Sequence, residues 1–209
     1  MTYPILAAIA VAWIERMDLS KVTSFLENLS PTPGRRQPVV LKNGVTVLRD
    51  DYKSPIETVE TALDAFGTIP ANRRLAVIGK ISELPGKRGP TYRWLGEKAA
   101  NVADKMIFIG GKRQLSSFRS GVKNVKLSSD SVVYHAKNIK NAISVLKKLL
   151  MFGDLVLLKG RNAQKLQRIV LGLEGKAVRC ELRECTTKLT TCDLCPMLES
   201  GWSDGRTVF

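Results

Sequence analysis

Three short apolar runs, each followed within two residues by a glycine, constrain most tightly how this chain can fold. They span residues 75–78, 106–109 and 155–158. A continuous apolar run of this length is typical of a strand that is buried on both faces, as in a parallel sheet. Segments with helical periodicity, at 91–103 and 138–150, lie between the runs. This alternation predicts an α/β fold in which helices cover both faces of a mostly parallel sheet.

The segments before this pattern predict a helical start and a hairpin. Residues 4–16 and 20–29 have helical periodicity, and the stretch 30–34, with two prolines and a glycine, interrupts it like a hinge. Asn43 and Gly44 lie between two β-branched runs, which indicates a tight β-hairpin. The remaining predicted elements are helices at 56–66 and 163–173 and weaker strands at 122–127 and 132–134.

These boundaries divide the chain into three parts. We expect a helical segment with a hinge at residues 1–34, an α/β domain at 35–175 and a small cysteine-containing tail at 176–209. A chain of 209 residues is long enough for one domain with a substantial core and a small appendage.

The charge balance favours anionic partners. The chain has 33 Lys and Arg against 19 Asp and Glu, a formal charge of +14. This excess would attract nucleotide phosphates, acidic peptides, nucleic acid or anionic lipid, although a solvated basic surface has the same composition. No apolar stretch reaches the about 18 residues of a membrane span, and the apolar N-terminal run continues directly into Glu15 and Arg16. We therefore expect a cytoplasmic protein with no membrane contact.

All the cysteines lie near the C-terminus, at Cys180, Cys185, Cys192 and Cys195. Four thiolates suit tetrahedral zinc in a structural site, and such clustering in a cytosolic-looking sequence favours a metal over disulfides. We therefore predict a structural zinc site in the tail. The alternatives are free reduced cysteines or a redox pair at Cys192 and Cys195.

A series of short motifs runs through most of the chain. The motifs are a Pro-Gly-Arg hinge at 33–35, an Asn-Gly hairpin at 43–47, an acidic turn at 50–52, a strand and loop at 75–84 and a Lys-Gly loop at 159–161. In order and spacing this set resembles the C-terminal, third domain of the Mur ligase family, and within it the branch that adds D-alanyl-D-alanine to a muramyl tripeptide. The first helix resembles the one that closes the family's central ATPase domain. The resemblance implies a Rossmann-like sheet.

The resemblance also implies an activity, the formation of an amide bond by an ATP-dependent ligase of peptidoglycan-like biosynthesis. ATP, with magnesium, would phosphorylate a carboxylate, and the amine of an incoming amino acid or peptide would attack the acyl phosphate. The third domain would hold that amine and close over the nucleotide, which an ATP-binding domain of the same or another chain would supply.

The phosphate-binding loop Gly-x-x-x-x-Gly-Lys-Ser/Thr is absent from the sequence. We therefore expect no catalytic residue in this chain and no activity from the chain alone. It is either part of a longer ligase or a natural standalone domain, and a start inside the closing helix favours the former.

Two groups of contact residues follow from the resemblance. An arginine fork suits phosphate, a carboxylate accepts hydrogen bonds from ribose hydroxyls, and cations suit a substrate carboxylate. The nucleotide-binding group is Arg35, Asp51 and Lys53, and the substrate-binding group is Lys159, Arg161 and Glu83.

Two other functions stay open at this point. A non-catalytic binding or scaffold protein could retain this domain without the ATPase half. A basic, zinc-containing nucleic-acid-binding protein would suit the charge and the cysteine tail, and its affinity would fall steeply with salt. The scattered tryptophans provide no stacking platform for bases, which disfavours that second alternative.

Overall fold

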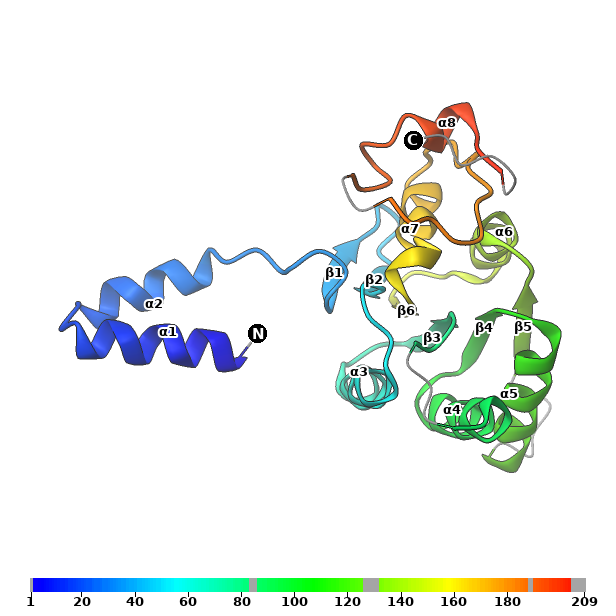
Figure 1. The fold of residues 1–209 in the computed structure, drawn as a ribbon, viewed down its shortest axis with the longest axis horizontal. Helices are drawn as coiled ribbons and strands as arrows, with labels where there is room; N and C mark the ends of the chain where they lie inside the picture. Colours follow the sequence, from blue (N-terminus) through cyan, green and yellow to red (C-terminus); the bar gives the residue numbers. More distant parts are fainter. Residues whose placement is uncertain (1, 83–85, 126–131, 188–189, 204–209) are drawn as a thin grey trace. The chain divides into compact units, whose positions relative to one another are not determined.

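The chain forms two compact units, Met1–Thr32 and Pro33–Phe209. The first unit is a pair of helices, and the second holds the sheet, the remaining helices and the C-terminal tail (Figure 1). The computed structural model describes residues 2–82, 86–125, 132–187 and 190–203.

The first unit consists of helices α1 (Thr2–Ile14) and α2 (Leu19–Glu27). Asp18 caps α2, because its carboxylate accepts a hydrogen bond from the Ser20 amide at 2.9 Å. Helix α1 carries apolar side chains on all of its sides, and its Trp13 is 69% exposed in this unit. Within the described residues, no helix is both long enough and apolar enough to cross a membrane.

The second unit is built on a six-stranded sheet in the order β1-β2-β6-β3-β4-β5. Strand β1 pairs antiparallel with β2, and all the other pairs are parallel. In the register, Ile78 of β3 lies opposite Lys159 of β6 and Phe108 of β4, so these strands end at the same edge. The strands are β1 (Gln37–Val40), β2 (Thr46–Asp50), β3 (Arg73–Ile78), β4 (Lys105–Ile109), β5 (Val132–Ala136) and β6 (Asp154–Lys159).

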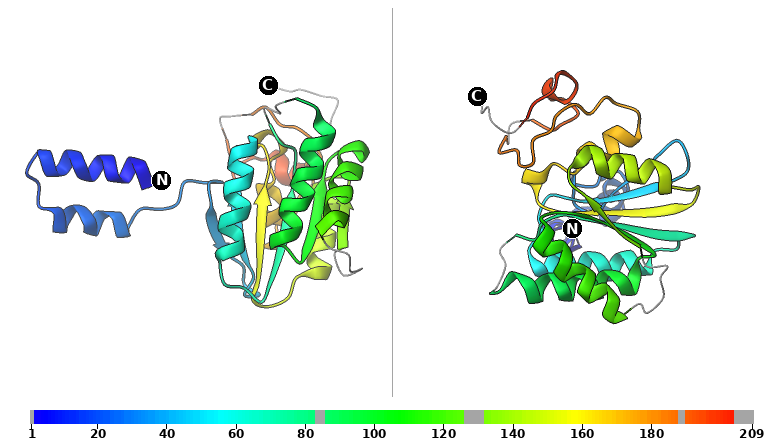
Figure 2. Two further views of the ribbon diagram at one scale, coloured as in Figure 1. Left: turned by 90° about the horizontal axis from the view of Figure 1, so that it is seen from below. Right: turned by 90° about the vertical axis from the view of Figure 1, so that its right-hand side faces the viewer.

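Helices cover both faces of this sheet, as the right-hand view of Figure 2 shows. One face carries α3 (Ile56–Thr68), α4 (Arg88–Val102) and α5 (Lys112–Val125). The other face carries α6 (Ile139–Leu149) and α7 (Gln167–Leu173), which follows the short 3-10 helix η1 (Asn162–Gln164). The tail contains one further short helix, α8 (Met197–Ser200). The predicted α/β class, with a mostly parallel sheet between helices, is confirmed.

The central strands are buried on both faces because their side chains alternate between two cores. In β3, Ala76 and Ile78 join the core under α3, α4 and α5, whereas Leu75 and Val77 join the core under α6 and α7. Strands β4 and β6 divide in the same way. Because successive side chains of a strand point to opposite faces, one all-apolar run contributes residues to both cores.

One predicted strand is wrong. Residues 122–125 form the last turn of α5, a helix that we did not predict, and residues 126–127 of the predicted strand lie outside the described residues. Leu115, Phe118 and Val122 bury one face of α5, and their spacing of three and four residues is helical. The two valines of this stretch favour a strand by β-propensity, but the packing of this segment against α4 overrides that preference.

Helices α4 and α5 approach each other closely because glycines face each other at their crossing. A Cβ on Gly121 would stand 1.8 Å from the Arg93 carbonyl oxygen, and one on Gly96 would stand 2.0 Å from that of Phe118. Real Cβ atoms do not come this close to backbone, so any side chain at either position forces the helices apart.

Gly121→Ala should therefore lower the free energy of unfolding by about 3 kcal/mol, the upper range for overpacking. Urea unfolding followed by circular dichroism measures this loss. Ser116→Ala, on the exposed side of the same helix, is the matched control and should leave stability unchanged or slightly raised. Equal stability of the two variants would show that the crossing has room for a methyl group.

The apolar surface of α1 should make the 209-residue chain self-associate as its concentration rises. Sedimentation analysis should show a larger species for the full chain than for a variant lacking residues 1–32. Lysine substitutions at Leu6 and Trp13, which are 54% and 69% exposed, should have the same effect as the deletion. If both variants still associate, the surface that mediates self-association is not α1.

Candidate functional site

The parallel strands bring the residues that follow them to one edge of the sheet. In open α/β sheets this carboxyl edge is where ligands bind. Here β3 leads into Gly79 and Lys80, and β4 leads into Gly110 and Gly111. Strand β5 leads into Lys137, so backbone-exposing glycines and cationic side chains meet at this edge.

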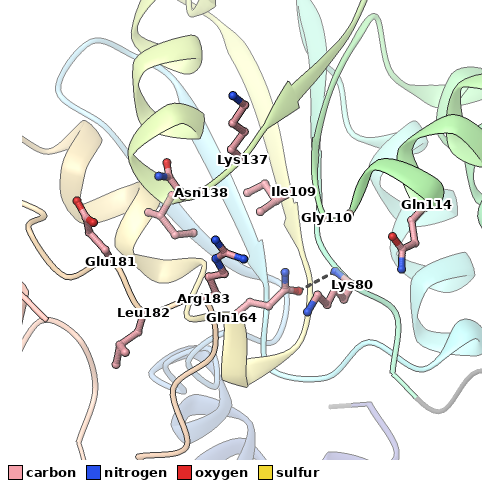
Figure 3. A pocket seen from close by; sticks show the side chains of 12 residues that line it. Lys80, Ile109, Gly110, Gln114, Lys137, Asn138, Gln164, Glu181, Leu182 and Arg183 are labelled. Carbon is pink, nitrogen blue, oxygen red and sulfur yellow. Dashed lines mark hydrogen bonds between the residues drawn. The ribbon is translucent and has the colours of Figure 1, made fainter. Parts of the chain in front are cut away.

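A pocket of about 280 Å³ lies at the ends of β3, β4 and β5 (Figure 3). Its walls come from the loops after these strands, from the first residues of α5 and α6, from η1 and from the C-terminal tail. Its polar and charged lining includes Lys80, Gln114, Lys137, Asn138, Gln164 and Arg183.

Gln164 is the buried polar group of this pocket, with only 4% of the residue exposed. Its Oε1 accepts a hydrogen bond from the Lys80 backbone N–H at 2.7 Å, the dashed line in Figure 3. Gly79 permits this approach, because a Cβ there would stand 2.4 Å from Oε1. The Gln164 side chain is one of the polar groups that line the pocket (Figure 3).

Two helices begin at the pocket. Helix α5 starts directly after Gly111, whose carbonyl accepts from the Leu115 N–H at 3.0 Å. Asn138 caps α6 by accepting a hydrogen bond from the Asn141 N–H at 2.9 Å. Both N-termini direct partial positive charge at the cavity, which favours an anionic group in it.

The C-terminal tail is attached to the sheet unit through Arg168. This side chain is only 1% exposed, and its guanidinium donates to the carbonyl oxygens of Cys180 (3.0 Å) and Leu182 (2.8 Å) in the tail. It also donates to the Gln164 carbonyl at 3.0 Å. One buried arginine therefore links the tail backbone to the segment that carries the pocket glutamine.

Ion pairs add to this attachment. Glu184 of the tail lies 2.5 Å from the Lys80 Nζ and 2.7 Å from an Arg161 Nη. Glu181 pairs with Lys140 of α6. Lys80 and then Arg161 hold the pKa of Glu184 below its usual value, so the tail carboxylate is ionised at neutral pH.

The predicted nucleotide-binding group lies on the hinge and the acidic turn, at the end of β2. The Tyr52 N–H donates to the Gly34 carbonyl at 3.1 Å, which joins the hinge to the turn. Arg35 lies over the Tyr52 ring, 4.6 Å from its centroid, and is exposed, as is Lys53. The structure thus brings the three predicted residues into one corner of the sheet edge, and their contact with a nucleotide stays a prediction.

Asp51 is the buried member of that group, 4% exposed and paired with Arg49 at 3.2 Å. Burial raises the pKa of the Asp51 carboxyl, while Arg49 opposes that rise. A Cβ on Gly34 would stand 3.1 Å from Asp51, so the hinge glycine covers the carboxylate closely.

Lys159, predicted to bind substrate, is enclosed by protein and only 1% exposed. Its Nζ donates to Asp50 at 2.7 Å, to the Lys53 carbonyl at 2.9 Å and to the Thr58 hydroxyl at 3.2 Å. Burial lowers its pKa, against the opposing effect of Asp50. In this arrangement the ammonium already has three partners, so a substrate contact would require them to rearrange.

Of the other two residues in the predicted substrate group, Arg161 pairs with Glu184 of the tail. Glu83 lies outside the described residues. Neither Lys159 nor Arg161 lines the pocket at the ends of β3, β4 and β5. Sequence reasoning missed its polar residues Lys80, Gln164 and Asn138, although the glycine after β3 marked the edge where they lie.

The zinc site predicted for the tail is not supported by the structure. The four cysteines do line one small cavity of about 30 Å³, together with Lys165 and Arg168. Within the described part of the chain, however, no three His, Cys, Asp or Glu side chains are grouped so that they could hold a metal ion. A physical reason is visible at Cys180, whose sulfur accepts a hydrogen bond from the Arg168 guanidinium at 3.3 Å, because a cation beside this thiol disfavours a metal cation at the same place.

Comparison with known sequences gives a consistent result. The pattern of the family described as Mur ligase, glutamate ligase domain, matches residues 34–162. The UDP-N-acetylmuramoyl-tripeptide--D-alanyl-D-alanine ligase of Synechocystis is 29% identical over 167 residues, which cover 79% of this chain and 35% of that protein. The UDP-N-acetylmuramoyl-L-alanyl-D-glutamate--2,6-diaminopimelate ligase of Geobacillus thermodenitrificans is 27% identical, over 84% of this chain and 36% of that protein. The chain thus spans about a third of the length of these relatives.

Solved structures share the fold. The MurF ligase of Thermotoga maritima in complex with ADP matches 80% of this chain and 36% of its own with a TM-score of 0.61, at 23% identity. A MurF structure from Acinetobacter baumannii matches 82% of this chain and 37% of its own with a TM-score of 0.67, at 18% identity.

Glu184→Gln should loosen the tail, because it removes the charge that Lys80 and Arg161 share. Hydrogen exchange at the Cys185 amide should become about two- to threefold faster, as expected for a largely exposed ion pair. Since the pKa of Glu184 is lowered from 4.5, the wild-type advantage should be present above that pH and disappear as the pH falls through the lowered value. Glu199→Gln, an exposed change in α8, is the control. Equal exchange in all three proteins at neutral pH would mean that Glu184 does not hold the tail.

Proposed function

This chain belongs to the Mur ligase family, and from that premise we propose that it is the substrate-side C-terminal domain of an ATP-dependent carboxylate–amine ligase. In the complete enzyme it binds the incoming amino acid or peptide and closes over ATP. The observation that carries this proposal is the pocket at the carboxyl edge, most of whose lining lies in the matched region and which has cations, amides and two helix N-termini around it.

The proposed reaction joins an acid to an amine in two steps. A carboxylate oxygen of the acceptor attacks the γ-phosphorus of ATP, which gives an acyl phosphate and releases ADP. The amine nitrogen then attacks the acyl carbon, the C–N bond forms as the C–O bond to phosphate breaks, and the amine loses a proton. The contribution of this domain is to position the amine, and orientation of this kind supplies a large part of the rate enhancement in such reactions.

The nucleotide side of the proposal rests on the corner formed by the hinge and the acidic turn. Arg35 is exposed there and can present its guanidinium to phosphate, while Asp51 is an acceptor suited to ribose hydroxyls. Asp51 is buried and paired with Arg49, so a ribose hydroxyl and Arg49 would both have to bind the same carboxylate.

Magnesium, which the family uses with ATP, would need oxygen ligands, and the described residues of this chain offer no grouped set of them. No metal-binding group of three side chains occurs among the residues that the structure describes. Asp50 and Asp51 are already paired with Lys159 and Arg49. We therefore assign the holding of magnesium to the nucleotide and to the ATPase domain.

The first unit has a place in the same proposal. A helix that is apolar on all sides is normally buried, yet α1 leaves Tyr3 86% and Trp13 69% exposed. We propose that the ATPase domain covers this surface in the complete ligase. The sequence contains no phosphate-binding loop, so the isolated chain should form no amide bond.

In the complete enzyme, Arg35→Ala should raise the KM for ATP about tenfold or more, because a charge-assisted contact to phosphate is lost. Steady-state kinetics with an amine substrate at saturation measure the change. Lys42→Ala, in the hairpin turn at the opposite end of β2, removes the same charge and should leave the KM unaltered.

An unchanged KM for ATP in Arg35→Ala would count against a nucleotide contact at the hinge. ATP-independent binding of an amino acid or peptide, with no turnover by the native protein, would instead support a non-catalytic binding protein built on the same domain.

A further inference from the structure

Arg49, near the end of β2, contacts each part of the corner formed by the hinge and the acidic turn. Its side chain is 15% exposed, and its guanidinium donates hydrogen bonds to the side chains of Gln37, Asp51 and Gln167. Building on the proposed function, we propose that Arg49 is a positioning residue of the nucleotide site, which aligns both Asp51 and Arg35 for their contacts with ATP.

The contact of Arg49 with the acidic turn involves both carboxylate oxygens. Its Nε donates to Asp51 Oδ1 at 3.2 Å, and its Nη2 donates to Oδ2 at 3.5 Å. A planar guanidinium that faces both oxygens fixes the plane of the carboxylate as well as its position. Each oxygen can accept more than one hydrogen bond, so the carboxylate that Arg49 orients can still accept from a ribose hydroxyl.

The contact with the hinge runs through Gln37 on β1. Arg49 Nη1 donates to Gln37 Oε1 at 3.1 Å, and the same oxygen accepts a hydrogen bond from the Gly34 N–H at 3.2 Å. The Gly34 carbonyl in turn accepts from the Tyr52 N–H at 3.1 Å. Gly34 is therefore held at both its N–H and its carbonyl, and it directly precedes Arg35. The direction in which Arg35 leaves the hinge thus depends on Arg49.

The third contact connects the corner to α7. Arg49 Nη2 donates to the Oε1 of Gln167, the first residue of that helix, at 3.0 Å. Gln167 lies beyond residue 162, where the family match ends. Three partners around one side chain require the fixed fork of an arginine, because a lysine ammonium is a single point charge at the end of a flexible stem.

The charge of Arg49 also acts on Asp51. Burial raises the pKa of the Asp51 carboxyl, and Arg49 opposes that rise. Lys159 of β6 is a second cation that interacts with Asp51, and it is itself paired with Asp50. From α7, the Gln167 backbone also lowers the pKa of Asp51. Removal of the Arg49 charge should therefore raise the pKa of Asp51 further, because less positive charge then opposes the effect of burial.

The test compares Arg49→Met with Arg73→Met in the complete ligase. Arg73 is the matched control, because it pairs with Asp154 at 2.9 and 2.7 Å at the opposite end of the sheet. Arg49→Met should raise the KM for ATP about tenfold, as expected when a charge-assisted contact is misaligned, with kcat at saturating ATP little changed. Arg73→Met should leave the KM for ATP as in wild type, although it also removes an ion pair.

A second readout separates positioning from a purely structural role. In the 209-residue chain, the side-chain carboxyl carbon of Asp51 can be followed by NMR through a pH titration. Its pKa should be higher in Arg49→Met than in wild type and unchanged in Arg73→Met. Arg49→Lys keeps the charge and loses the fork, so it should return the pKa toward the wild-type value and recover the KM only in part.

Gln37→Ala tests the contact with the hinge by itself. It should raise the KM for ATP about three- to fivefold, as expected for the loss of one neutral hydrogen bond, and leave the pKa of Asp51 as in wild type. In an Arg35→Ala background the same change should have no further effect, because Gln37 acts through Arg35.

The outcomes separate the inference from the proposed function. An unchanged KM for ATP in Arg49→Met, together with a raised KM in Arg35→Ala, overturns the positioning role and leaves the nucleotide contact intact. Equal increases in Arg49→Met and Arg73→Met also overturn it, because the loss then follows from general destabilisation. If neither Arg35→Ala nor Arg49→Met alters the KM, this corner does not contact the nucleotide, and the inference falls with that part of the proposed function.

Discussion

In the middle of β3, β4 and β6 the side chains alternate between two apolar cores, so neither face of these central residues accommodates a polar group. A polar group buried there without a partner would cost about 1–3 kcal/mol. Polar and charged residues are consequently displaced to the ends of the strands, where the backbone turns away from the cores. The pocket, the hinge corner and the attachment of the tail all lie along the edge that this exclusion leaves.

Buried charges organise that edge. Lys159 holds Asp50 and the Lys53 carbonyl, while Arg168 holds tail carbonyls and the segment before it. Such groups contribute little net stability, because desolvation offsets much of their attraction. Their effect is to fix geometry. A buried charge without a partner is costly, so each charged group keeps its partners in place. Lys159 thereby fixes the acidic turn against β6, and Arg168 fixes the tail against the pocket.

The pattern of apolar runs was sufficient to predict the strands of the sheet and most of its helices. It failed at α5, where the charged and polar residues of 112–125 hid a helix whose buried face is short and includes Gly121. That glycine is understandable only from the crossing with α4, which no local pattern shows. The zinc prediction is also not supported. The four cysteines line one small cavity, but among the described residues no three potential metal ligands are grouped so that they could hold an ion, and Arg168 donates to the Cys180 sulfur.

The amino-acid sequence by itself determined the α/β class, the family and the edge of the sheet where ligands should bind, because these follow from periodicity, order of motifs and the glycines after the strands. Only the tertiary structure decided which polar residues meet at that edge. Lys80 and Gln164 are 84 residues apart in the sequence, and Arg183 lies in the C-terminal tail. The contacts of Arg168 and Glu184 bring these parts of the chain together. Lys159, by contrast, was expected to face a ligand and is buried among three protein partners. Contacts between residues distant in sequence depend on packing, and one sequence carries no direct record of them.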